Sequence, residues 1–264
     1  MKAILLSAGY ATRLYPLTLD KPKALLDVNG RPVIEHIVDK ISKIENVDEI
    51  IIVTNNKFYD NFAEWKMACE CKKPLFIIND NTNNNEERLG AIGDINFAIE
   101  ERKIDDDAII VNSDNLFSFN LNEIYEYFIL NSDTIGMFDV GSLDIARKMG
   151  NPLLDKENRI VLFKEKDQDT KSSLCSVGIY LFSRSTMKLF YKYLSEGNSP
   201  DKSGEFVEWL YKRNPVYGYV FDNKREYWFD IGSKEDYNNA CEYLSGLMEI
   251  DKMKILHNQD ESEK

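Results

Sequence analysis

The sequence predicts an α/β protein: a doubly wound, mostly parallel sheet with helices on both faces and a mixed α+β lobe embedded in its C-terminal half. Three observations support this prediction. Strand-like and helix-like segments alternate through the first half of the chain. The strand-like segments are continuous apolar runs, as in sheets covered on both faces. The 264 residues are 43% hydrophobic and 12% aromatic, which is enough for a folded globule.

The first half supplies the alternating elements. Strands are expected at Lys2–Leu6, Glu49–Val53, Leu75–Ile78 and Ala108–Val111, and helices at Val33–Ile44, Phe58–Ala68 and Leu89–Glu100. Ligands of such sheets bind at the carboxyl ends of the strands. We therefore expect the binding site at the turn after Leu6, the loop after Ile78 and the loop that contains Asp114.

The second half has a different texture, with short strands joined by turns. Strands are expected at Thr134–Val140, Asn151–Leu154, Arg159–Lys164, Ser176–Phe182, Tyr217–Phe221 and Tyr227–Ile231, and helices at Thr186–Leu194, Gly204–Arg213 and Lys234–Leu247. We expect one domain over residues 1–250, made of a core (1–130), an embedded lobe (131–230) and a closing helix (231–250). Residues 251–264 form an expected polar tail.

Composition narrows the classes of function. The net charge of −12 disfavours nonspecific binding to nucleic acid, and no run of about 18 apolar residues predicts a membrane span. The N-terminus lacks a signal-peptide pattern, and the four cysteines do not form a zinc pattern, so we expect a cytoplasmic protein with reduced thiols. The two histidines look structural, so acid–base chemistry would fall to Lys, Asp or Glu.

Two cationic positions follow the first strand. Small residues in Ser7–Arg13 would let backbone N–H groups approach an anion closely, and Arg13 could grip phosphate oxygens. Lys23 follows a stiff proline and precedes an apolar Ala-Leu-Leu that would hold its base in place. Taken alone, each has a plain alternative: a tight turn that closes a βα unit, and a solvated surface lysine.

Two carboxylates follow apolar strands. Asp114 ends one buried run, and Asp230 follows Trp228 and Phe229. Such a pair suits Mg²⁺, which is commonly bound by one or two carboxylates together with substrate phosphates. Either aspartate by itself could instead cap a helix.

The combination of these motifs resembles the signature of the sugar-phosphate nucleotidyltransferases, the pyrophosphorylases that make nucleotide sugars. The motifs are Leu-Ser-Ala-Gly-x-x-Thr-Arg-Leu-x-Pro-Leu-Thr from Leu6, Lys-Pro-Lys-Ala-Leu-Leu from Lys21, Val-Asn-Ser-Asp-Asn from Val111 and Trp-Phe-Asp-Ile-Gly-Ser from Trp228. The resemblance covers about residues 1–245 and is greatest for the glucose-1-phosphate thymidylyl- and uridylyltransferases. It implies a Rossmann-like fold and Mg²⁺-dependent transfer of a nucleotidyl group from an NTP to a sugar-1-phosphate, with release of pyrophosphate. It also implies a role in nucleotide-sugar supply, as for cell-surface polysaccharide.

The resemblance also implies roles for individual residues. Arg13, Lys23 and Asp114 would be catalytic, and Asp114 and Asp230 would hold the metal. The nucleotide would contact Leu6, Ala8, Gly9, Tyr10, Ala11, Thr12, Arg13, Asn79, Thr82, Asn84 and Gly90. The acceptor would contact Lys23, Gly150, Glu165, Lys166, Gly178 and Tyr180. Residues 1–130 would then be the nucleotide-binding core and residues 131–230 the acceptor-binding lobe.

Departures from the family pattern leave the substrates open. Tyr10-Ala11 replaces the commoner small pair, and the base-reading loop is rich in asparagine from Asn79 onward. That loop also resembles, faintly, the choline-phosphate cytidylyltransferases, so CTP with phosphocholine is an alternative pair of substrates. An aromatic cage for choline could draw on Trp209, Tyr217, Tyr219 and Trp228. A further alternative is a nucleotide-sugar-binding protein without catalysis. A homodimer remains open, and the sequence names neither the NTP nor the acceptor.

Overall fold

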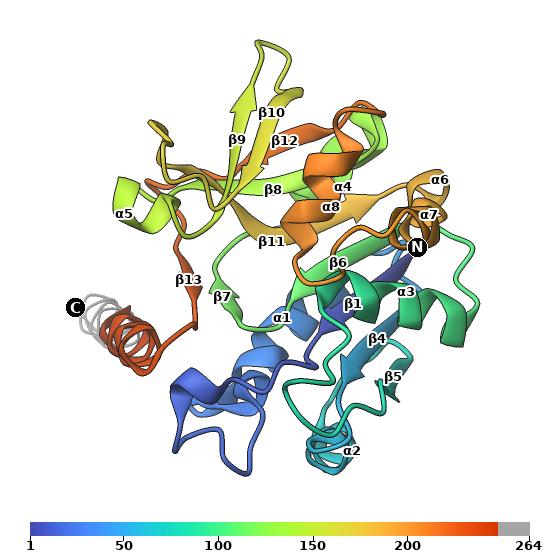
Figure 1. The fold of residues 1–264 in the computed structure, drawn as a ribbon. Helices are drawn as coiled ribbons and strands as arrows, with labels where there is room; N and C mark the ends of the chain where they lie inside the picture. The colour runs from blue at the N-terminus through green and yellow to red at the C-terminus, as the bar shows by residue number, and fades with distance from the viewer. Residues whose placement is uncertain (248–264) are drawn as a thin grey trace, which may run out of the picture.

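A seven-stranded mixed sheet runs through the computed structural model, which describes residues 1–247 (Figure 1). Six strands run in the same direction, and only β11, between β6 and β8, lies antiparallel to its neighbours in this sheet. The sheet order is β12 (Tyr217–Val220), β8 (Thr134–Asp139), β11 (Leu174–Phe182), β6 (Ala108–Asn112), β1 (Lys2–Leu6), β4 (Glu49–Thr54) and β5 (Leu75–Asn79). The α/β fold with a large, mostly parallel sheet is therefore confirmed.

Helices cover both faces of the sheet because its central strands are apolar on both sides. In β1, Ala3 and Leu5 pack into one core, whereas Ile4 packs into the other, and all three are fully buried. The first core includes side chains of α1 (Val33–Ser42), α2 (Tyr59–Ala68) and α4 (Leu121–Asn131). The second includes side chains of α3 (Ala91–Arg102), α6 (Arg184–Met187), α7 (Leu189–Ser195) and α8 (Ser203–Leu210).

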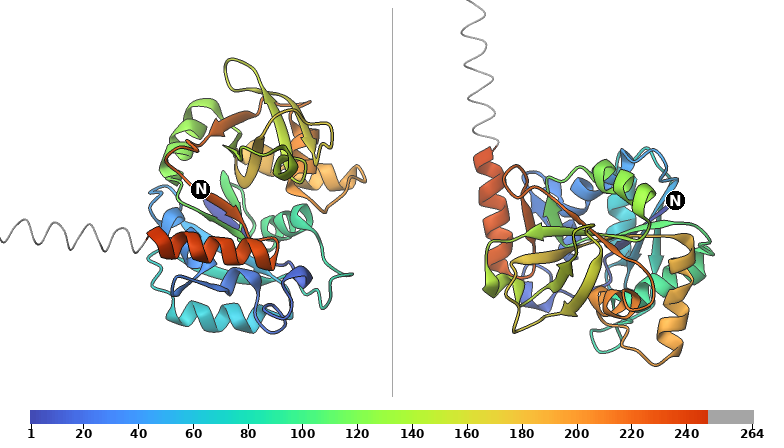
Figure 2. Two further views of the ribbon diagram at one scale, coloured as in Figure 1. Left: turned by 90° about the vertical axis from the view of Figure 1, so that its left-hand side faces the viewer. Right: turned by 90° about the horizontal axis from the view of Figure 1, so that it is seen from above.

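Smaller elements surround the carboxyl ends of β1 and β6. The hairpin of β9 (Gly150–Leu154) and β10 (Ile160–Glu165) rises from the sheet, and β13 (Trp228–Asp230) pairs antiparallel with β7 (Asn115–Phe117) (Figure 1). A helix over residues 234–247 follows β13 and packs on a third apolar cluster with residues of the N-terminal segment (Figure 2). The short elements are η1 (Thr12–Leu14), η2 (Lys23–Leu25), β2 (Asp27–Val28), β3 (Arg31–Pro32) and α5 (Leu143–Ala146).

The structure departs from the sequence expectations at a few elements. The helix α4 and the short elements β7 and α5 were not predicted, and the helix expected over 186–194 is divided into α6 and α7. No helix among the described residues is both long and apolar enough to cross a membrane. The expected tail over 251–264 and the last residues of the closing helix lie outside the described part of the chain.

Candidate active site

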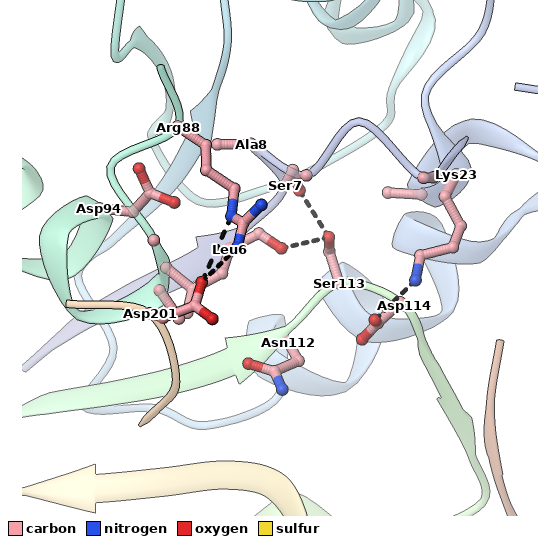
Figure 3. A pocket seen from close by; sticks show the side chains of 15 residues that line it. Leu6, Ser7, Ala8, Lys23, Arg88, Asp94, Asn112, Ser113, Asp114 and Asp201 are labelled. Carbon is pink, nitrogen blue, oxygen red and sulfur yellow. Dashed lines mark hydrogen bonds and ion pairs between the residues drawn. The ribbon is translucent and has the colours of Figure 1, made fainter. Parts of the chain in front are cut away.

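Two neighbouring parallel strands end side by side and fix the centre of the site. Leu6 at the end of β1 lies in register with Asn112 at the end of β6. Beyond them, Ser7 Oγ donates a hydrogen bond to Ser113 Oγ (2.7 Å), and Ser113 Oγ donates to the carbonyl of Leu6 (2.5 Å) (Figure 3). Ser113, which replaces the glycine usual in this motif, thus fastens the Asp114 loop to the N-terminal turn.

The N-terminal turn borders a cavity of about 260 Å³. Its backbone is held by Asn55 Nδ2, which donates to the carbonyl of Ala8 (2.8 Å), and Ala11 adopts a left-handed φ of 48° that starts η1. A Cβ atom on Gly9 would meet nothing within 4 Å, so this glycine keeps the backbone open to the cavity. The predicted site residues that line this cavity are Leu6, Ala8, Gly9, Ala11, Lys23, Gly90 and Asp114. We call it the nucleotide cavity, and its neighbour described below the acceptor cavity, after the roles that the motifs predict for them.

Lys23 and Asp114 line this cavity, and the charges of both act on Asp230 nearby. Lys23 Nζ lies 2.7 Å from Asp114 Oδ2, and the buried Ala24 and Leu25 anchor the lysine's short helix. Asp230 comes from β13, whose pairing with β7 sets it opposite Asn115. Burial, and then the charge of Asp114, raise the pKa of Asp230 to about 7, although Lys23 opposes this shift.

A second cavity of about 420 Å³ adjoins the same carboxylates. Glycines shape it: a Cβ on Gly150 would lie 2.5 Å from the ring of Phe163, and one on Gly204 would lie 2.1 Å from Oε2 of Glu165. Burial raises the pKa of Glu165, and nearby lysines oppose the shift. The predicted residues that line this acceptor cavity are Arg13, Asp114, Gly150, Glu165, Lys166, Gly178, Tyr180 and Asp230.

Two residues of β11 form the floor of the acceptor cavity. Gly178 has a φ of +69°, and a Cβ there would lie 2.6 Å from Nδ2 of Asn112, so no larger residue fits without movement. Tyr180 is 5% exposed, and burial raises the pKa of its phenol well above the usual value. The phenol therefore stays neutral and forms an uncharged wall of the cavity.

Some predicted nucleotide contacts lie away from the nucleotide cavity. Thr12 is exposed on η1 and does not line it. Asn79 donates to the side chain of Asn56, and Asn84 accepts from the backbone of the loop that follows it. The hydroxyls of Tyr10 and Thr82 lie 3.2 Å apart within a buried cluster. The Asn-rich loop is therefore folded on itself.

Sequence reasoning missed three charged residues that line the nucleotide cavity: Arg88, Asp94 and Asp201. Arg88 Nη2 lies 2.9 Å from Asp201 Oδ1, an ion pair between the α3 and α8 loops (Figure 3). The carbonyls of Asp201 and Pro200 accept hydrogen bonds from the first N–H groups of α3 (3.0 and 2.9 Å). The one available signal was Asp94, which follows the predicted Gly90 by one helical turn.

The donor set fits Mg²⁺. Asp114 and Asp230 are both oxygen donors, and their mutual repulsion, visible in the raised pKa of Asp230, is what a bound cation would relieve. Residues 1–247 contain no cluster of three or more metal-ligating side chains, so substrate phosphates and water would complete the coordination.

A doubly wound sheet whose strand ends carry two adjoining cavities, both lined by Asp114, is typical of a nucleotide-binding α/β protein. The chain belongs to the nucleotidyl transferase family, whose model matches residues 2–245. This confirms the family expected from the sequence motifs, and with it the expected enzyme class, nucleotidyltransferase.

The chain is also similar to individual proteins of this kind over most of its length. The chain is 26% identical to the bifunctional protein GlmU of Methanocaldococcus jannaschii over 95% of this chain and 56% of that protein. It is also 26% identical to the mannose-1-phosphate guanyltransferase of Candida albicans, over 94% of this chain and 66% of that protein. The chain thus spans little more than half of the GlmU relative. A crystal structure from Bacillus anthracis, provisionally assigned as a glucose-1-phosphate thymidylyltransferase and complexed with sucrose, shares the fold (TM-score 0.79, 22% identity, 92% of this chain and 94% of that one).

Proposed function

We propose that this chain transfers a nucleoside monophosphate from an NTP to a sugar-1-phosphate and releases pyrophosphate. One observation carries the proposal: Asp114 lines both cavities, with its partner Lys23 on the nucleotide side and Asp230 on the acceptor side. A nucleotide in the first cavity and a phosphorylated acceptor in the second would bring their phosphates together at this point. Alignment of two bound substrates could lower the barrier by about 7–11 kcal/mol.

The reaction needs charge neutralisation more than proton transfer. The acceptor phosphate is already ionised near neutral pH, so one of its oxygens can attack the α-phosphorus directly. The new P–O bond forms as the bond to the β-phosphate oxygen breaks, and pyrophosphate leaves with that electron pair. Lys23 borders the nucleotide cavity and Lys166 borders the acceptor cavity, and both would offset the negative charge. Mg²⁺ held by Asp114 and Asp230 would supply further neutralisation when bound.

Arg13 is well placed for the leaving group. Its side chain is exposed on η1 and lines the acceptor cavity, and it makes no hydrogen bond or ion pair within residues 1–247. An arginine without a protein partner retains its full set of donors for phosphate oxygens. We therefore assign it to the pyrophosphate end of the nucleotide.

The lining of the acceptor side favours a sugar phosphate over phosphocholine. Of the four aromatic residues considered for a choline cage, only Trp228 lines the acceptor cavity or the larger hollow of about 710 Å³ beside it. Trp209 instead packs in the core and donates to Glu196. Cationic Arg147, Lys148 and Lys166 line the larger hollow and would repel a quaternary ammonium group.

Pyrophosphate release tests the proposal. The protein would be incubated with Mg²⁺, each of the common NTPs, and a panel of sugar-1-phosphates together with phosphocholine. Release with at least one sugar-1-phosphate is the expected result. Release with phosphocholine alone would establish the cytidylyltransferase alternative. No release with any pair of substrates would favour the alternative of a nucleotide-sugar-binding protein without catalysis.

Two substitutions test the central pair. Lys23→Ala and Asp114→Ala should each lower turnover by at least ~10²-fold, because each removes a group that balances charge at the transferred phosphate. Lys21→Ala is the matched control: it removes an exposed lysine two residues away and should leave turnover near normal. Near-normal turnover in the Lys23 or Asp114 variant would remove that residue from the mechanism.

A further inference from the structure

One wall of the nucleotide cavity contains Asp94, an acidic residue to which the reaction described above assigns no role. We call it the acidic wall. Asp94 lies in the first turn of α3, where its backbone N–H donates to the carbonyl of Gly90 (2.8 Å). Its side chain lines the nucleotide cavity, yet the residue is only 6% exposed. Figure 3 shows Asp94 and Lys23 on opposite sides of Ser7 and Ala8, so the acidic wall lies away from the phosphate-binding end.

Asp94 has a second buried carboxyl group as its neighbour. Asp80 is 7% exposed, and its Oδ1 accepts hydrogen bonds from the backbone N–H and the hydroxyl of Thr82 (both 2.8 Å). The other oxygen of Asp80, Oδ2, and Oδ1 of Asp94 are buried and receive no N–H or O–H donor from the described part of the chain. The charge of Asp80 acts on Asp94, so this buried pair holds a proton more readily than an ordinary carboxyl group does.

Asp94 is the group that carries this proton. Burial, and then the charge of Asp80, raise the pKa of Asp94 to about 8, whereas Thr82 stabilises the ionised form of Asp80. Asp94 therefore retains its proton near neutral pH. Its buried Oδ1 receives no donor among residues 1–247, and the side chain lines the cavity, where it can accept a hydrogen bond from a ligand.

We propose that Asp94 reads the nucleobase and selects one whose Watson–Crick edge carries an amino group (cytosine, adenine or guanine) over uracil or thymine. This rests on the proposed function, which puts an NTP in this cavity. An amino group donates to the acceptor oxygen of Asp94, whereas uracil and thymine flank their single N3–H with two carbonyl oxygens that the carboxyl would repel. The phosphates would lie at the other end, where Lys23 attracts them.

Nucleotide binding without acceptor tests this inference separately from catalysis. Dissociation constants of CTP, ATP, GTP, UTP and dTTP would be measured by titration calorimetry for the wild type and for two variants. The wild type should bind one amino-bearing nucleotide at least ~10-fold more tightly than UTP or dTTP, the size of one good hydrogen bond lost. Asp94→Ala should reduce this preference to within ~3-fold.

Asp94→Asn is the conservative variant that keeps the geometry. Its amide has nearly the shape of the protonated carboxyl group and carries no charge, and its carbonyl oxygen keeps an acceptor for the base, so the preference should survive. Asp60→Asn on the exposed surface of α2 makes the same chemical change elsewhere and should leave all five constants unchanged. Circular dichroism would check that each variant is folded.

Three results would overturn the inference: tightest binding of UTP or dTTP by the wild type, an unchanged preference in Asp94→Ala, or loss of preference in Asp94→Asn as complete as in Asp94→Ala. A protein that binds NTPs with the expected preference but releases no pyrophosphate would contradict the proposed function alone. A protein that releases pyrophosphate from UTP or dTTP in preference to the other nucleotides would contradict the base selection alone.

Discussion

Asp230→Asn should stabilise the metal-free protein, and the gain should grow with pH. The carboxyl of Asp230 is mostly buried beside Asp114, and its pKa rises from an ordinary 3.8 to about 7. Because the folded value lies above the unfolded one, the folded state retains the proton longer than the unfolded state does. The contribution to stability is fully present below about pH 4 and is lost as pH rises through about 7.

The pKa shift sets the size of the effect. Linkage between these two pKa values makes the ionised carboxyl cost about 2 kcal/mol more at about pH 8 than at about pH 5.5. Asparagine cannot ionise, so the variant should lack this part of the pH dependence. Chemical unfolding with a metal chelator present would measure the free energy of unfolding of both proteins at the two pH values.

A control and a clear refutation accompany this measurement. Asp60→Asn removes an exposed carboxylate and should follow the pH dependence of the wild type. If the stabilities of Asp230→Asn and the wild type change in parallel between the two pH values, then Asp114 and Asp230 do not repel each other as described. The assignment of these two residues as a metal pair would then lose its physical basis.

Two further predictions concern glycines of the acceptor cavity. Gly204→Ala puts a Cβ 2.1 Å from Oε2 of Glu165 and should raise the acceptor KM at least ~10-fold by displacing that carboxylate. Steady-state kinetics would show this, and Gly246→Ala, which meets nothing within 4 Å, is the matched control. Gly178→Ala should lower the free energy of unfolding by at least about 1 kcal/mol, because its φ is +69° and its Cβ would crowd Asn112. A Gly178→Ala protein as stable as the wild type in denaturant would contradict this reading.

The sheet could be predicted well from the sequence because its central strands are continuous apolar runs. Apolar runs such as Ala108–Val111 are buried on both faces, so their composition reflects their position directly. The helix α4 was missed because its pattern is mixed: Ile124 and Phe128 face the core, but Leu130 is 83% exposed. Its start at Asn120, a residue that accepts from the N–H of Asn122, was the signal available in the sequence.

Site residues that belong to sequence motifs could be predicted. Site residues that are brought to the cavity only by the folding of distant segments could not. Lys23 and Asp114 belong to motifs, and the structure brings them within 2.7 Å of each other. The polar loop after β5 read as a base-binding segment because it is rich in amides. Its side chains instead form hydrogen bonds with neighbouring polar side chains. Asp94, which the sequence alone would suggest lies on the surface of a helix, lines the cavity. Contacts between distant loops, such as Arg88 with Asp201, have no local pattern at all.

The segment from Pro200 to Gly204 gives the two cavities a common wall. Its carbonyls hold the first N–H groups of α3 beside the nucleotide cavity, and its last residue leaves the space that Glu165 fills in the acceptor cavity. A ligand that shifts this segment from within one cavity therefore also changes the shape of the other cavity. Thermodynamics then requires reciprocity: the factor by which an acceptor analogue changes the affinity for nucleotide must equal the factor by which nucleotide changes the affinity for that analogue. We expect that factor to differ from one and to approach one when the Arg88–Asp201 ion pair is removed.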